Sequence, residues 1–382
     1  MHKIAWLFWL GFFLILSCTR DAPYPVSAIK SGELMITDSL RIKTFNRPRL
    51  VANRGRDTLV FYDMLAHNIS VLSQKGDTLS FFNRFGSGDQ EHGRLRGVSL
   101  LSNGNLLLYA TYDWWIYDLS GKFVRRGRVG PSGVIANPAP GLRASVLEHN
   151  DSTFLIYPGG INPTYPAGSQ AFFEHVRFVS KLALDHNAYR TGIGFERESP
   201  YLEKYYYGGI PLIAAQGDQI FVKPVVGPRL YIYQSSDFAI KESFQIDGQP
   251  FPSGVPYTLD EQKRKQIAFQ HWQQSVVYTH LLPSSKEGVW LQRKLPQGES
   301  IEPVKSIAAY YNQGMHGRRE SQLVFFADNE SLKYDIPSTW QLAGVLKNGA
   351  PILVSDLNEV ENTLTVYFSR INFIRENGFV VE

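Results

Sequence analysis

The chain has 382 residues and a formal net charge of +4, because 39 basic residues nearly balance 35 acidic ones. The basic residues form no concentrated stripe of the kind that neutralises phosphates, so we expect no nucleic-acid partner. The single cysteine excludes a disulfide framework and a zinc site built on several thiolates. Aromatic residues make up 13% of the chain, which favours pleated sheets and an all-β fold.

The N-terminal segment has the features of a bacterial export signal. Lys3 precedes an apolar run over residues 4–16 that is too short to span a membrane comfortably. Ser17 and Cys18 then follow as in a lipobox, with Leu16 bulkier than is usual at its position. We therefore expect cleavage before Cys18 and lipid attachment at Cys18, with enough acyl chains for stable anchoring. A plain signal peptide and an uncleaved anchor are the alternatives.

The sequence divides into a signal peptide over residues 1–17, a lipid-anchored tether over 18–31 and a single domain over 32–382. The lipid would place the protein in the bacterial cell envelope, on the outer membrane or on a surface facing the periplasm. Glycine and proline are scattered along the whole domain, so no stretch looks like an interdomain linker. Closed all-β architectures reach this length as one domain.

A unit of four short strands recurs in the first part of the domain. The first copy has apolar segments at 50–52, 59–62, 69–72 and 78–82, and the second has them at 98–101, 106–109, 114–117 and 123–124. In each copy the last two segments join through a tight turn, containing Gly76 or Gly121, which is a hairpin signal. Four antiparallel strands per unit form the blade of a β-propeller.

The first strand of the unit and its polar turn recur four more times, so the sequence predicts a six-bladed β-propeller. These turns lie at 150–151, 217–218, 286–288 and 347–349. Residues 34–43 precede the first unit and are expected to supply the outer strand of the last blade, which would close the ring and remove free sheet edges. A β-sandwich, an open solenoid and a ring of seven blades are the alternatives.

One segment departs from the strand pattern. Thr258 and Glu261 form a capping box, which predicts a short helical insertion over about 258–273. This segment lies between the fourth and fifth blades.

The loop after the first unit, residues 83–92, reads NRFGSGDQEH. It resembles the Arg-x-Gly-x-Gly-Pro-x-Glu-aromatic loop of the TolB-like six-bladed β-propeller lipoproteins, which share the lipobox. Asp89 replaces the proline and His92 replaces the aromatic residue. The resemblance implies a bacterial propeller of the envelope and carries no catalytic residue over. From the residues themselves, Gly86 and Gly88 permit positive φ where the chain turns from one blade to the next.

The sequence contains none of the common catalytic or metal-binding motifs. Its nine histidines form no His-x-His or His-Glu-x-x-His pattern, and no Gly-x-Ser-x-Gly elbow is present. We therefore assign no catalytic residue and no cofactor, and we expect no enzyme. Acids from separate blades would still be able to meet in a central channel. A metal-dependent hydrolase or lactonase with its site there is the alternative function.

Two aromatic clusters are candidates for ligand binding, since flat rings stack on sugars and on apolar partners. One contains Tyr112 and Trp114, and the other contains Tyr205, Tyr206 and Tyr207. We expect Trp115, in contrast, to pack in the core.

The function favoured by the sequence is a binding or protein-interaction module, because a rigid ring with variable loops suits recognition. We expect a monomer that meets the membrane through its lipid and binds an envelope protein or a glycan. A role inside an envelope assembly, as for TolB-like proteins, is a further hypothesis.

Overall fold

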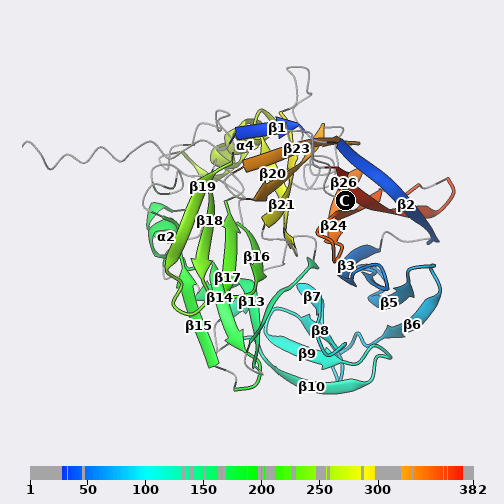
Figure 1. The fold of residues 1–382 in the computed structure, drawn as a ribbon. Helices are drawn as coiled ribbons and strands as arrows, with labels where there is room; N and C mark the ends of the chain where they lie inside the picture. Colours follow the sequence, from blue (N-terminus) through cyan, green and yellow to red (C-terminus); the bar gives the residue numbers. More distant parts are fainter. Residues whose placement is uncertain are drawn as a thin grey trace, which may run out of the picture.

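The computed structural model describes residues 28–31, 33–44, 48–130, 134–136, 142–149, 152–161, 165, 169–186, 188–196, 199, 202, 211–224, 229–246, 255, 259–284, 288–296, 320–327, 330–355, 357–358 and 360–372. Over these residues the chain forms six sheets arranged radially around one axis (Figure 1). The predicted six-bladed β-propeller is confirmed, and the sandwich, the solenoid and the seven-bladed ring are wrong.

Each blade is a meander of four antiparallel strands that runs from the axis outward. Blades 1 to 3 contain, in this order, β3 (Arg49–Arg54), β4 (Thr58–Tyr62), β5 (Asn68–Ser73) and β6 (Thr78–Asn83); β7 (Gly97–Leu100), β8 (Leu106–Tyr109), β9 (Asp113–Tyr117) and β10 (Phe123–Arg128); and β12 (Ser145–His149), β13 (Ser152–Ile161), β14 (Val179–Ala183) and β15 (Ala188–Ile193). Blades 4 to 6 contain β16 (Leu212–Gln216), β17 (Gln219–Lys223), β18 (Arg229–Gln234) and β19 (Ile240–Gln245); β20 (Val277–Ser284), β21 (Gly288–Lys294), β22 (Ser321–Ala327) and β23 (Glu330–Ile336); and β24 (Trp340–Val345), β25 (Pro351–Ser355), β26 (Thr363–Asn372) and β2 (Glu33–Lys43).

Two further strands extend these sheets. The strand β11 (Val134–Ala136) pairs with β13 in blade 3. The strand β1 (Ala28–Ser31) pairs in parallel with β23 and covers the outer edge of blade 5. Residues 28–31, which the sequence assigned to the tether, are therefore part of the propeller. Their backbone groups pair with those of β23, whose outer edge would otherwise be open.

Glycines in the left-handed region make the tight turns that the sequence predicted. Gly76 and Gly121 have φ of 88° and 82° in the turns between the third and fourth strands of blades 1 and 2. A Cβ on Gly121 would lie 2.4 Å from the Phe82 ring, so this turn of blade 2 packs directly against blade 1. Glycine is needed there for both its φ and its lack of a side chain.

The ring is closed by β2, as predicted. This strand pairs antiparallel with β26 from Glu33↔Asn372 to Lys43↔Thr363, with one irregularity between Ile36 and Asp38. Leu40 and Ile42 on its inner side pack against an apolar cluster that joins blade 6 to blade 1. Strands from the two ends of the domain therefore complete one sheet.

The core lies between the blades. An apolar cluster fills each of the six interfaces between neighbouring blades. Trp115 is buried between blades 1 and 2, as expected from the sequence. Trp290 is buried between blades 5 and 6, where its Nε1 donates a hydrogen bond to Gly349 O at 2.8 Å. Packing of this kind replaces disulfides as the source of rigidity.

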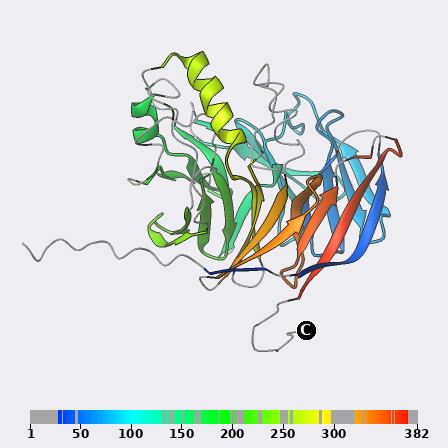
Figure 2. The same cartoon turned by 90° about the horizontal axis from the view of Figure 1, so that it is seen from above.

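Two helices lie on one face of the ring, opposite to β1 (Figure 2). The predicted helix is α4 (Glu261–Gln273), between blades 4 and 5. Thr258 of the predicted capping box lies outside the described residues. At the start of the helix, the Asp260 carboxylate accepts a hydrogen bond from Lys263 N at 2.9 Å, as an N-cap residue does. The second helix, α2 (Gln170–His175), joins β13 to β14 and was not predicted.

The closing strand should depend on its inner side chains. Leu40→Ala removes a partly buried side chain between blades 6 and 1, and we expect it to lower the free energy of unfolding by about 1–3 kcal/mol. The neighbouring Arg41 is exposed on the other face, so Arg41→Ala should change this free energy by less than about 0.5 kcal/mol. Denaturant titrations followed by tryptophan fluorescence measure both changes. Equal effects would contradict the register of β2.

Candidate functional site

The two members of the first aromatic cluster have different surroundings. Tyr112 lies in the loop between β8 and β9 and is 60% exposed. Trp114 is 3% exposed, packs between blades 2 and 3, and lies beneath the Arg125 guanidinium at 5.4 Å. A ligand at this place would therefore contact Tyr112 and not the Trp114 ring.

The remaining predicted site residues are Cys18, Tyr205, Tyr206 and Tyr207. They lie outside the described residues, and their roles stay predictions. Within the described ranges, no helix has the length and apolar character needed to cross a membrane.

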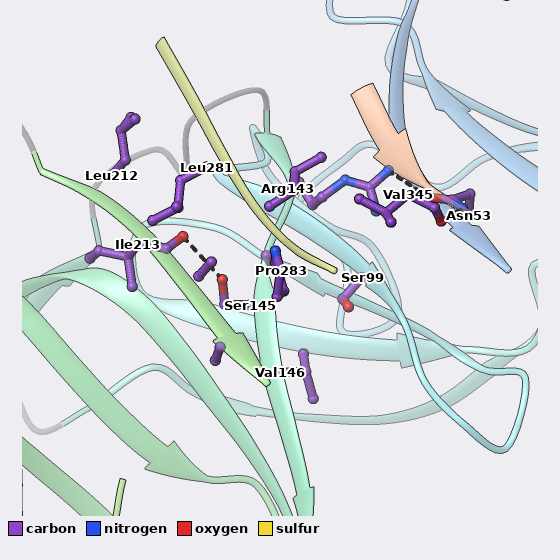
Figure 3. A pocket seen from close by; sticks show the side chains of 14 residues that line it. Asn53, Ser99, Arg143, Ser145, Val146, Leu212, Ile213, Leu281, Pro283 and Val345 are labelled. Carbon is purple, nitrogen blue, oxygen red and sulfur yellow. Dashed lines mark hydrogen bonds between the residues drawn. The ribbon is translucent and has the colours of Figure 1, made fainter. Parts of the chain in front are cut away.

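The central channel contains a cavity of about 240 Å³ (Figure 3). Residues on the inner strands of all six blades line it, including Asn53, Ser99, Ser145, Ile213, Leu281 and Val345. The lining residues are mostly aliphatic, but the surface that faces the cavity is mostly polar. The polar side chains of the lining are Asn53, Ser99, Arg143 and Ser145.

Arg143 is the charged residue of this lining. Its main chain lies directly before β12 and beside β7, where Ala144 N donates to Val98 O at 2.8 Å. Its side chain reaches toward the far side of the channel (Figure 3), where Nη2 donates to Asn53 Oδ1 at 3.0 Å and to Ala343 O. One guanidinium thus connects blade 3 with blades 1 and 6.

Asn53 holds the other end of this network. Its Nδ2 donates to Val345 O at 2.9 Å and to Gly55 O at 3.1 Å. These two bonds orient the side-chain amide so that its oxygen faces Arg143. A Cβ on Gly344 would lie 2.5 Å from Asn53 Oδ1, so glycine at this position in β24 leaves room for the amide.

Burial lowers the pKa of Arg143 to about 10, so the side chain stays protonated at neutral pH. Its hydrogen-bond partners are neutral oxygens, and no ion pair joins it to a carboxylate among the described residues. Both bonds use Nη2, which leaves the donors of Nη1 and Nε without a protein partner in the same part of the chain. A partly buried cation in this state favours a nearby anion.

Sequence reasoning missed Arg143 and Asn53. The only available signal was a polar or charged residue beside an apolar inner strand, as in residues 143–147. Which residues of these strands face the axis depends on their register, which the sequence alone does not determine.

Acidic residues are not among the lining residues of the cavity. Across the described part of the chain, no three His, Cys, Asp or Glu side chains lie close enough together to hold a metal ion. The hypothesis of a metal-dependent hydrolase or lactonase therefore gains no support from the channel lining.

The glycine-rich loop after blade 1 packs around Glu91. The Glu91 carboxylate accepts a hydrogen bond from Gly88 N at 2.8 Å, and its Oε2 would lie 2.0 Å from a Cβ on Gly86. Neither glycine uses the positive φ that its lack of a side chain permits. The two glycines instead allow the carboxylate to approach the main chain.

His92 occupies the place of the expected aromatic residue. It is fully buried and makes edge contacts with Phe85, Trp115 and Tyr117 at centroid distances of 6.2–6.4 Å. Its Nδ1 lies 2.9 Å from Gly93 O, which accepts only, so Nδ1 carries the proton. Its Nε2 is buried without a partner among the described residues. Burial lowers the pKa of His92, and the ring is held neutral.

No family model matches the sequence, and no curated protein matches it. Among solved structures, a member of the DUF4221 family from Bacteroides vulgatus is similar with a TM-score of 0.66 and 11% identity, over 90% of this chain and 99% of that one. A candidate exported protein from Bacteroides fragilis is similar with a TM-score of 0.54 and 13% identity, over 91% and 99%. The chain thus shares its fold with bacterial six-bladed propellers.

A neutral His92 should make stability depend on pH. Because its pKa is lower in the folded chain than the ordinary value of 6.5, the unfolded chain binds the proton first as pH falls. Stability due to this ring is therefore present above pH 6.5 and is lost progressively below it. We expect His92→Phe, which keeps an aromatic ring without a titrating group, to lose less stability than the wild type between pH 7.5 and 5.0. Urea titrations at several pH values measure this difference, and identical slopes would contradict a neutral buried imidazole.

Proposed function

We propose that the protein is a lipid-anchored binding module of the bacterial cell envelope, which presents one face of a rigid propeller to an envelope protein or glycan. The observation that supports this most is the position of β1 on the face of the ring opposite to α2 and α4 (Figure 2). The proposed anchor precedes β1 in the chain, so it would lie toward the β1 face.

The length of the proposed tether favours this orientation. Residues 19–27 separate Cys18 from Ala28, and nine extended residues reach at most about 30 Å. The β1 face would therefore stay close to the lipid surface, and the face with the helices would point away from it.

The two faces differ in their connections. The face near β1 has tight turns, such as those with Gly55, Gly104 and Gly217 in the left-handed region. The opposite face has the connections between the second and third strands and between successive blades, which include Tyr112, α2 and α4. Longer loops on a rigid scaffold are the usual place of recognition.

The fold similarity to the two Bacteroides proteins supports a bacterial propeller, and one of them is itself described as a candidate exported protein. The loop over residues 83–92 adds the more specific hypothesis of a TolB-like lipoprotein, in which Glu91 and the two glycines fit the motif and His92 serves as the aromatic residue.

Removing the lipidation site should release the protein from membranes. In bacteria that process lipoproteins, we expect the wild type in the membrane pellet and Cys18→Ser in the soluble fraction, since the acyl chains supply the membrane affinity. Thr19→Ser is the matched control and should stay in the pellet. An uncleaved anchor would keep Cys18→Ser in the pellet, and a plain signal peptide would leave the wild type soluble; either result contradicts the proposal.

The loop face and the β1 face of the ring should also differ in the envelope components that they contact. A photo-crosslinking amino acid at Tyr112 should give a reproducible adduct with an envelope component in intact cells. The same amino acid at Asn103, which is exposed in a tight turn on the opposite face, should not give that adduct. Electrophoresis after irradiation measures both. The same adduct from both positions would contradict recognition by the loop face.

A further inference from the structure

The cavity of the central channel has a mostly polar surface. Each inner strand pairs with only one strand of its own sheet, so its other edge is open toward the axis. An open edge presents main-chain N–H and C=O groups. The side chains of Asn53, Ser99, Arg143 and Ser145 add to this polar surface. A ligand in the channel would therefore meet hydrogen-bond donors and acceptors on several sides.

Arg143 supplies the charge of the cavity, and part of its guanidinium is available to a ligand. The bonds of Nη2 to Asn53 Oδ1 and Ala343 O hold the group in place from two other blades. Nε and Nη1 have no partner among the described residues, and both remain accessible to solvent. Because these donors are already ordered, a ligand would not have to immobilise a long side chain.

Two hydroxyl groups line the same cavity. The Ser99 hydroxyl makes no hydrogen bond to the described part of the chain. The Ser145 hydroxyl donates to Ile213 O at 3.2 Å, which leaves its own oxygen able to accept. The cavity thus combines a fixed cation with neutral groups of both hydrogen-bonding kinds.

The charge, the polarity and the size of the cavity select among anions. One guanidinium without a carboxylate in the lining balances one negative charge, so a monoanion fits better than a dianion. Walls with donors and acceptors favour an oxyanion that carries its own O–H groups. The volume of about 240 Å³ is below that of pockets for drug-sized ligands, so the anion must be small. Singly charged phosphate meets these conditions, and its four oxygens point in different directions, as a cavity enclosed by six blades requires.

We propose that the central channel is a binding site for inorganic phosphate in its singly charged form, with Arg143 and the Ser99 hydroxyl as donors to its oxygens. This inference goes beyond the proposed anchoring and partner recognition and does not depend on them.

Isothermal titration calorimetry on the full-length protein in detergent micelles tests this site, with empty micelles as the blank. At pH 6 inorganic phosphate is mainly a monoanion. Sulfate has a similar shape with a second charge and no O–H group, and butyrate has a single charge with a hydrocarbon chain. In the wild type we expect saturable binding of phosphate, with sulfate and butyrate at least roughly tenfold weaker. No saturation by phosphate, or equal or tighter binding of either comparison anion, would overturn the proposal. This comparison needs no variant.

Substitutions then locate the site. Arg143→Met keeps much of the side-chain length and removes the charge, and it should weaken phosphate binding by roughly tenfold or more. Ser99→Ala removes one neutral donor and should weaken binding by roughly two- to tenfold. Arg41→Met removes an arginine from the exposed face of β2 and should leave binding unchanged. Circular dichroism checks that each variant is folded. Phosphate binding of wild-type strength in folded Arg143→Met, or an equal loss in Arg41→Met, would contradict the assignment to the channel.

Discussion

The antiparallel pairing of β2 with β26 is the constraint on which the ring depends. Without β2 the last blade would have three strands, and its outer edge would be open to another chain. The register from Glu33↔Asn372 to Lys43↔Thr363 joins residues that lie more than 300 positions apart in the chain. Closing so long a loop costs conformational entropy, which the cluster beneath Leu40 and Ile42 offsets by burying apolar surface between blades 6 and 1.

Closure also determines the chemistry at the axis. It brings β24 beside β3, so that Val345 O accepts from Asn53 and Ala343 O accepts from Arg143. Neutral oxygens from two blades then offset part of the cost of moving a guanidinium out of bulk water, and they leave its positive charge uncompensated. A strand pairing at the outer edge of the molecule thus fixes a charged group at its centre.

The strands and their turns were predictable because their signals are local. The glycine turns, the apolar segments and the additional strand before the first unit identified all six blades and the closure of the ring.

The neighbouring residues Trp114 and Trp115 show what local patterns do not predict. Their side chains point to opposite faces of β9. In a sheet with one face on the core and the other in solvent, one of the two would be exposed. In a propeller each blade has a neighbour on both sides, so Trp114 packs toward blade 3 and Trp115 toward blade 1, and both are buried. Arg143 was missed for the related reason that only the assembled ring shows which residues face the axis.

Burial on both sides of every blade also limits where this molecule can recognise anything. Rotating or sliding one blade would open the clusters on its two sides, so the ring behaves as a rigid body. The surfaces that remain uncovered by a neighbouring blade are the loops on the face with α2 and α4, where we propose recognition, and a few axial side chains. His92 shows the same restriction in the loop between blades 1 and 2: enclosed by Phe85, Trp115 and Tyr117, it serves as a neutral ring in the core and not as a proton donor at a surface. Arg143 differs because the channel leaves space beside its guanidinium.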